Sequence, residues 1–224
     1  MLASIEGVQI SWLGHDGFKL KGGVTVAIDP FRISVRSNEK ADIIFITHEH
    51  FDHCSPKDIV QIISPTTVIV APQIAKDCLS SFPNEKVFVK PFENGEVLGV
   101  KFYTVPAYNI NKFRAPGVVF HPKEDGRVGY VISMNGVRFY HAGDTDAVPE
   151  MKEVEAEVAM LPVSGVYVMT AEEAVEALKM IRGVQVAIPM HWGSIVGSRD
   201  DALRFKELAE PLGVRVLVPE REPW

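Results

Sequence analysis

The sequence predicts an α/β fold in which buried sheets are covered by helices. Short apolar runs rich in Val and Ile recur along the 224 residues, and each is bounded by Gly, Pro or Asp. Strands dominate the first half, and strands then alternate with helices twice. No Gly/Ser-rich or Pro-rich linker divides the chain, so we expect a single domain over residues 1–224.

The predicted strands are short and mostly apolar on both faces, as expected for sheets that are covered on both sides. They span Val8–Leu13, Phe18–Lys21, Val24–Ile28, Asp42–Thr47, Thr67–Ala71, Lys86–Val89, Val97–Val105, Gly129–Met134, Val137–His141, Val158–Pro162, Val184–Pro189 and Val214–Val218. Asn135-Gly136 separates two of these runs and is typical of a type I′ turn, which predicts a hairpin. The segment Tyr108–Arg127 is long and irregular, and we expect a functional loop there.

Three helices are predicted from their capping residues. The N-cap residues are Ser55, Thr170 and Ser198. Pro56 suits the first helical position, and Thr170 forms a capping box with Glu173. Gly183 and Gly213 suit the ends of the second and third helices. The third helix carries an apolar stripe formed by Ala202, Phe205, Leu208, Ala209 and Leu212.

Composition limits the class of protein. A net charge of −6 argues against a broad nucleic-acid-binding face, and no apolar run is long enough to cross a membrane. The first seven residues lack the pattern of a signal peptide. Cys54 and Cys78 are too few for a disulfide framework, so we expect two reduced thiols and a cytoplasmic location. A homo-oligomer remains open.

Chemistry is concentrated in the segment His48-Glu49-His50-Phe51-Asp52-His53, which follows a buried strand and precedes a helix. Ligands collect at such strand-to-helix connections in α/β sheets. In an extended backbone His48, His50 and Asp52 face one point, while His53 turns to a neighbouring one. Imidazole and carboxylate together suit zinc, iron or nickel, so this segment predicts part of two adjacent metal sites. The alternative is a solvated polar loop.

Two distant residues are candidates to complete the sites. Asp144 follows the strand Val137–His141 in a Gly-flanked turn, where a carboxylate could bridge two ions. His191 ends another apolar strand. The alternatives are an Asx-turn aspartate and a core histidine.

Taken together, His48-x-His50-x-Asp52-His53, Gly143-Asp144 and His191 resemble the metallo-β-lactamase superfamily. The segments Leu13-Gly14-His15 and Ile28-Asp29-Pro30-Phe31 resemble the branch that holds the bacterial L-ascorbate-6-phosphate lactonase. The resemblance implies a four-layer αββα sandwich with two divalent metals, most simply Zn, with Mn, Fe or Ni as alternatives. It implies one metal at His48 and His50 and another at Asp52, His53 and His191, bridged by Asp144.

The third ligand of the first metal departs from the family pattern. Relatives place a histidine shortly after a Pro-Ala pair, whereas here Pro106-Ala107-Tyr108 is followed by Asn109. Either Asn109 coordinates through its oxygen or through water, or His121 enters from the long loop. If neither does, the protein holds a single metal.

Two metals that share a water would lower its pKa from about 15.7 toward about 7 and supply hydroxide at neutral pH. This predicts a hydrolase of a small ester, lactone or phosphodiester, in which Asp52 orients the nucleophile. His15 is the candidate acid for the leaving group, and a hairpin histidine is the alternative. Tyr108, Lys112 and Arg114 are the candidates to bind an anionic small molecule, with an ordinary solvated loop as the alternative.

Trp192 and Tyr167 either line a pocket or belong to the core.

Three rival interpretations remain open. One is an iron-dependent redox protein, although the diiron flavoproteins of this fold carry a His-x-Glu pattern where this chain has His50. Another is a sensor or binding protein that kept one metal. A nuclease is disfavoured because the chain has no room for a large inserted domain and its charge is acidic.

Overall fold

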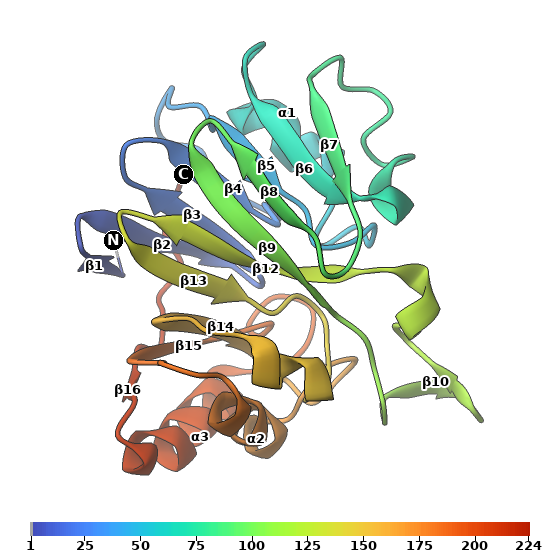
Figure 1. Cartoon of the computed structure of the whole chain (residues 1–224), viewed down its shortest axis with the longest axis vertical. Coiled ribbons are helices and arrows are strands. Elements are labelled where there is room, and N and C mark those ends of the chain that lie inside the picture. Colours follow the sequence, from blue (N-terminus) through green and yellow to red (C-terminus); the bar gives the residue numbers. More distant parts are fainter. Residues whose placement is uncertain (1) are drawn as a thin grey trace.

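The computed structural model describes residues 2–224 and shows two packed sheets with helices on their outer faces (Figure 1). The first sheet has the strand order β1-β2-β3-β4-β5-β6-β7, antiparallel through β4 and parallel from β4 to β7. Its strands are β1 (Ala3–Ile5), β2 (Val8–Gly14), β3 (Gly17–Lys21), β4 (Thr25–Ile28), β5 (Ile43–Phe45), β6 (Val68–Pro72) and β7 (Lys86–Val89).

The second sheet has the order β16-β15-β14-β13-β12-β9-β8 and is parallel from β13 to β16. Its strands are β8 (Asn94–Val97), β9 (Val100–Pro106), β12 (Val128–Met134), β13 (Val137–His141), β14 (Val158–Pro162), β15 (Val186–Met190) and β16 (Arg215–Val216). A separate hairpin pairs β10 (Phe113–Ala115) with β11 (Val118–Val119).

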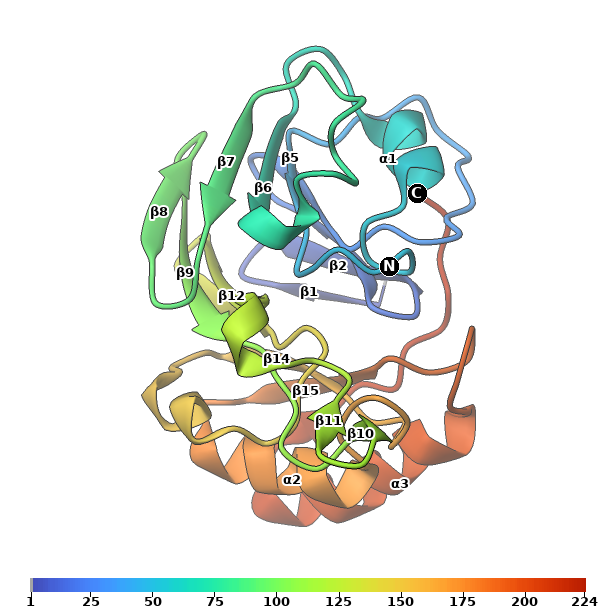
Figure 2. The same cartoon turned by 90° about the vertical axis from the view of Figure 1, so that its right-hand side faces the viewer.

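Helix α1 (Pro56–Ile62) covers the first sheet, and α2 (Ala171–Met180) and α3 (Arg199–Ala209) cover the second (Figure 2). Short 3₁₀ turns span Gln73–Ala75, Lys123–Asp125, Pro149–Glu153 and Glu210–Leu212. The four layers confirm the predicted αββα sandwich. None of the helices within residues 2–224 has both the length and the apolarity to cross a bilayer.

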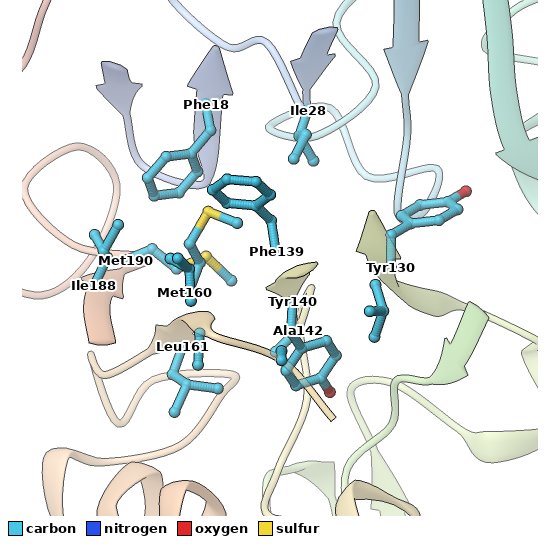
Figure 3. Close-up of a cluster of buried hydrophobic side chains, with 14 of the residues drawn as sticks. Phe18, Ile28, Tyr130, Phe139, Tyr140, Ala142, Met160, Leu161, Ile188 and Met190 are labelled. Atoms are coloured by element: carbon cyan, nitrogen blue, oxygen red, sulfur yellow. The ribbon is translucent and has the colours of Figure 1, made fainter. Parts of the chain in front are cut away.

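The core lies between the sheets and under the helices. Phe18 and Ile28 of the first sheet face Phe139 and Met160 of the second, and all four are fully buried (Figure 3). Successive strand residues point to opposite faces, so Tyr140 and Leu161 lie on the helix-covered side of the second sheet. Strands that are apolar on both faces therefore stand in the middle of the sandwich, which is the pattern that the sequence shows.

Most predicted elements are present, and the capping boxes of α2 and α3 are both formed. The Asn135-Gly136 turn joins β12 to β13 with positive φ at both residues, as a type I′ turn requires. Ser55 is the N-cap of α1, but its hydroxyl donates to the carboxylate of Asp58 instead of accepting from the backbone.

Four local predictions are wrong or incomplete. The single strand predicted at Val97–Val105 is the hairpin β8–β9, which turns at Leu98-Gly99 with positive φ at both residues. Leu212 is 45% exposed instead of buried, because α3 ends at Ala209 and Leu212 lies in the 3₁₀ turn Glu210–Leu212, where Pro211 cannot continue the α-helix. Strand β1 and the hairpin β10–β11 were not predicted, since each strand is at most three residues long.

The expectation of two reduced thiols is also wrong, because Cys54 and Cys78 form a disulfide with their Cα atoms 6.4 Å apart. They lie 24 residues apart in sequence, so spacing gave no signal. Strands β5 and β6 are parallel neighbours, and the loops that follow them meet at one edge of the sheet. The cysteines therefore give no support to a reducing compartment, and the cytoplasmic location stays a prediction.

Candidate metal centre

The candidate site lies in the loops that follow the carboxyl ends of β5, β9, β13 and β15. These loops belong to both sheets and meet at one edge of the sandwich. Parallel strands place their carboxyl ends together, which explains why residues more than a hundred positions apart converge there. His48, Asp144 and His191 are each at most 3% exposed.

Four side chains form a first cluster around Asp144, with one potential ligand atom each within 4.8 Å of the others: His48, His50, His121 and Asp144. The Nδ1 atom of His50 lies 3.1 Å from Nε2 of His48 and 3.4 Å from Nε2 of His121. Nε2 of His121 lies 3.4 Å from Oδ2 of Asp144. This cluster could hold one metal ion with three nitrogens and a carboxylate.

A second cluster adjoins the first and shares Asp144. Nε2 of His53 lies 3.4 Å from Oδ1 of Asp144, and Nε2 of His191 lies 3.3 Å from Oδ2. Asp52 adds a carboxylate whose Oδ2 lies 3.7 Å from Nε2 of His53. The two oxygens of Asp144 thus face histidines of both clusters, which is the arrangement that a bridging carboxylate needs.

The ring nitrogens that point away from the clusters are each paired with a fixed partner. Nδ1 of His48 is 3.0 Å from Oγ1 of Thr47, Nδ1 of His53 is 2.8 Å from Asp29, and Nδ1 of His191 is 2.9 Å from Oγ of Ser164. Such contacts set the orientation and tautomer of metal-binding histidines. Here they leave Nε2 of each ring free to face the centre.

A bound cation would satisfy polar atoms that this site leaves without partners. Nε2 of His53, Nε2 of His191 and Oδ1 of Asp144 are buried and have no hydrogen-bond partner. Each such atom costs about 1–3 kcal/mol in a folded protein. Because all three border the space around Asp144, divalent cations would satisfy them together, and the donor set of imidazoles and carboxylates suits zinc, manganese, iron or nickel.

Burial controls the histidines of the first cluster. It lowers the pKa of His121 to about 4 and lowers the pKa of His48 well below its ordinary value. Both rings are therefore neutral at neutral pH, which is the form that binds a metal.

Carboxylates control the second cluster. Burial lowers the pKa of His191, but the charges of Asp144 and Asp16 outweigh it and raise that pKa to about 9. Burial raises the pKa of Asp52, but His53 and a hydrogen bond from His15 outweigh it and lower that pKa to about 2. Without metal, the carboxylates here are thus balanced by protons on histidine.

The structure separates the roles of Asn109 and His121, which the sequence left open. His121 lies in the first cluster, whereas Oδ1 of Asn109 accepts from the backbone N–H of His121 and lies 2.8 Å from its Nδ1. The amide nitrogen of Asn109 donates to the carbonyl of Tyr167 and to Asp146. Asn109 therefore sits behind His121 instead of among the potential ligand atoms.

His15 does not reach open space. It is 1% exposed, and its Nε2 lies 3.0 Å from Oδ2 of Asp52. Burial lowers its pKa to about 4, so the ring is neutral and Nε2 donates to the carboxylate. The expectation that His15 protonates a leaving group finds no support in this geometry, which makes His15 a partner of Asp52.

The three residues expected to bind an anionic substrate do not line the cavity beside the clusters. The hydroxyl of Tyr108 donates to Glu150, and Nζ of Lys112 lies 2.7 Å from Glu173 and 3.4 Å from Asp146. Arg114 is exposed in β10. The two aromatic residues left open by the sequence have different places. Tyr167 lines the cavity, whereas Trp192 is buried and stacks on Trp12 in the core.

Sequence reasoning missed Asp29 and Ser164 as partners of the histidines. Asp29 is fully buried and also accepts from the backbone N–H and the hydroxyl of Thr47. Its position after the predicted strand Val24–Ile28 was the available signal, because an acidic residue at the end of a buried strand needs partners. Nothing in the sequence around Ser164 marks it.

Known proteins resemble this chain in sequence and in fold. A family model described as "Beta-lactamase superfamily domain" matches residues 9–191. A UPF0173 metal-dependent hydrolase of Thermoplasma volcanium is 35% identical over 96% of this chain and 97% of its own length. One of Thermoplasma acidophilum is 32% identical over 97% and 98%. The crystal structure of a proposed metal-dependent hydrolase from Parabacteroides distasonis superposes with a TM-score of 0.83 at 29% identity, over 96% of this chain and 94% of that one.

Proposed function

Because the chain belongs to the β-lactamase superfamily and, within it, to the UPF0173 metal-dependent hydrolases, we propose that it is a two-metal hydrolase that cleaves a small ester or lactone. The phosphodiester expected as an alternative substrate is less favoured, because no lysine or arginine among residues 2–224 lines the cavity to bind the phosphate oxygens beside the metals. Zinc is the proposed metal, since three histidine nitrogens face the first prospective ion and two face the second, and zinc favours such ligands.

One observation carries the proposal. Nitrogen and carboxylate atoms from four loops converge around Asp144, and the histidine nitrogens that point outward are held by Thr47, Asp29, Asn109 and Ser164. A solvated polar loop would leave these rings free to rotate. A site in which both the inward and the outward nitrogens are placed is preorganised for a cation.

We assign the first metal to His48, His50, His121 and Asp144. The second is assigned to Asp52, His53, His191 and Asp144, with Asp144 shared. Asp144 suits this role because its pKa is lowered well below the usual range, where burial, which would raise it, is outweighed by His191 and His53. The carboxylate is therefore ionised at any pH at which the enzyme would work.

Two divalent cations at these positions would lower the pKa of water and polarise the substrate carbonyl. The side chains of the chain supply the orientation. Asp52 lines the cavity and is fixed by the hydrogen bond from His15, so its other oxygen can orient the attacking water by accepting a hydrogen bond from it. The buried Thr47 and Asp29 hold His48 and His53 against rotation.

Metal analysis combined with hydrolysis tests the proposal. Zinc-loaded protein should contain about two zinc ions per chain and hydrolyse phenyl acetate and a γ-lactone faster than a phosphodiester. The Asp144→Ala variant should lose most of its zinc and all turnover, whereas the exposed carboxylate variant Asp200→Ala should retain both. Two bound metals without turnover of any of these substrates would favour a binding or sensor protein, and stable binding of iron with redox activity would favour the redox alternative.

A further inference from the structure

The cavity that opens onto Asp144 has a volume of about 250 Å³. Four of its lining residues belong to the metal clusters, and the other four are aromatic or aliphatic. These four are Phe51, Phe120, Tyr167 and Ile195. The volume lies below the range of about 300–1,000 Å³ that holds drug-sized ligands, so the cavity suits a group the size of one ring or a short aliphatic chain.

Three of these four side chains are exposed, and Phe120 is half-buried. Phe51 is 67% exposed although it lies between two ligand candidates, and Ile195 is 38% exposed. Tyr167 has a φ of 69°, which a bulky side chain rarely adopts, and its backbone carbonyl accepts from the amide of Asn109. Its ring packs edge to face on Phe120 with centroids 4.7 Å apart. A strained backbone that holds an aromatic ring at a cavity indicates that the ring has a role there.

The cations near this edge of the molecule are already paired. Lys112 lies beside Glu173, Lys123 donates to Glu150, and Arg127 pairs with Glu49 and Asp125. No lysine or arginine within residues 2–224 lines this cavity. Recognition of a phosphate or carboxylate normally requires such a group.

The carboxylates work in the same direction. Asp29, Asp52 and Asp144 would offset most of the positive charge of two divalent cations, so a charged group held away from the metals, in the apolar half of the cavity, gains little from them. A charged group in the apolar half of the cavity would also lose its hydration without a partner. Burial of an uncharged ring against Phe51, Phe120 and Tyr167 carries no such cost.

We propose, on the basis of the hydrolase function argued above, that the substrate is uncharged and that its single aryl or short aliphatic group occupies the cavity between Phe51, Phe120, Tyr167 and Ile195. This replaces the sequence-based expectation of an anionic substrate.

A matched pair of non-hydrolysed ligands tests the charge preference without turnover. 4-Acetamidobenzamide and 4-acetamidobenzoate differ only in the charge of one ring substituent, and both are amide analogues of an aryl acetate. Ligand-observed NMR on the metal-free and the zinc-loaded protein should show the neutral compound binding at least tenfold more tightly. Equal or tighter binding of the carboxylate would overturn the proposal.

Variants place the ligand in this cavity. Phe51→Ala should weaken binding of the neutral compound about tenfold, as expected for the loss of one aromatic wall. Ile195→Lys should bring the carboxylate analogue to equal or greater affinity. Leu203→Lys, which makes the same change at an exposed position of α3 outside the cavity, should leave both affinities unchanged. An Ile195→Lys protein that binds the two analogues as the parent protein does would exclude this cavity.

Turnover separates this inference from the hydrolase function. The esters 4-carbamoylphenyl acetate and 4-carboxyphenyl acetate form the corresponding substrate pair, and the neutral ester should have the lower KM. A lower KM for the charged ester would overturn the inference and leave the hydrolase intact. Preferential binding of the neutral amide by a zinc-loaded protein that cleaves neither ester would support the cavity and remove the hydrolase function.

Discussion

The contact between Asn109 and His121 gives the sharpest test of how the first metal is held. Oδ1 of Asn109 accepts from the backbone N–H of His121 and from its Nδ1, and both residues are at most 5% exposed. The Asn109→Ala variant removes this acceptor but leaves Nε2 of His121 in place. We expect zinc to bind with unchanged stoichiometry and reduced affinity.

The magnitude follows from the two hydrogen bonds. Loss of a partner behind a metal-binding histidine typically costs about 10- to 100-fold in metal affinity. The same substitution leaves a buried N–H and a buried ring nitrogen without an acceptor, at about 1–3 kcal/mol each, so the metal-free protein should lose about 2–6 kcal/mol of its free energy of unfolding. The upper values apply only if no water reaches the vacated space.

Competition with a chromophoric zinc chelator measures the affinity, and chemical denaturation of the metal-free protein measures the stability. His121→Ala should remove about one zinc per chain, in contrast to Asn109→Ala. The neighbouring Asn111→Ala, which removes only exposed hydrogen bonds, one donated to Glu173 and one accepted from Lys112, is the matched control. If Asn109→Ala lost a whole zinc while His121→Ala kept it, Asn109 would be the ligand and the assignment would be refuted.

Three further predictions concern protons, the disulfide and Asp29. The pKa of His191 in the metal-free protein is raised to about 9, so its ring is protonated at pH 7.5 and must lose that proton to bind a metal. Zinc binding should therefore release at least one proton per chain at pH 7.5, and this ring should release almost none above pH 10. A pH indicator dye measures the released protons. Denatured protein that has not been reduced should show no free thiol with a thiol reagent. Cys78→Ser should lower the free energy of unfolding by about 2–4 kcal/mol, because it opens the loop that the Cys54–Cys78 disulfide closes. Two reactive thiols in unreduced protein would instead support the reduced thiols expected from the sequence. Asp29→Asn should weaken zinc binding about 10- to 100-fold by releasing the ring of His53, which a chelator competition measures; unchanged affinity would show that Asp29 does not fix that ring.

The sequence was sufficient for those features that depend on short-range patterns. Apolar strands, capping residues and the Asn135-Gly136 turn are set by neighbours in the chain, and the structure contains them. Most of the assigned metal ligands likewise come from the six consecutive residues His48 to His53. The histidine and aspartate at distant strand ends could be inferred because parallel strands align their carboxyl ends.

The features that the sequence did not give depend on contacts between distant loops. The pairing of Cys54 with Cys78 and the contacts of Ser164 and Asp29 with histidine rings each join segments that only the completed sheets bring together. The sequence could not decide between Asn109 and His121 as the metal ligand for the same reason. Both residues have suitable chemistry, and only the return of the loop to the site decides which one faces Asp144.

The contacts of Lys112 show why its residue type alone does not place it among the substrate-binding residues. The chain leaves the site after Asn109, forms the hairpin β10–β11 and must bring His121 back beside the residue it left. The backbone N–H of Asn109 donates to the carbonyl of His121 and closes this loop at its base. Lys112 ties the same loop to Glu173 of α2 and to Asp146, and Asp146 accepts from the backbone N–H groups of residues 110 and 111.

This use of Lys112 links the cation-rich loop to metal binding instead of substrate recognition. A lysine that is 12% exposed and already paired with two carboxylates has little charge to offer a ligand, and its loss would loosen the segment that carries His121. The polar contacts of this loop therefore hold a potential metal ligand in place, as the partners of the outward-facing histidine nitrogens do. With the nearby cations paired in this way, the cavity keeps mainly aromatic walls beside the metal ligands, which supports the proposal of an uncharged substrate.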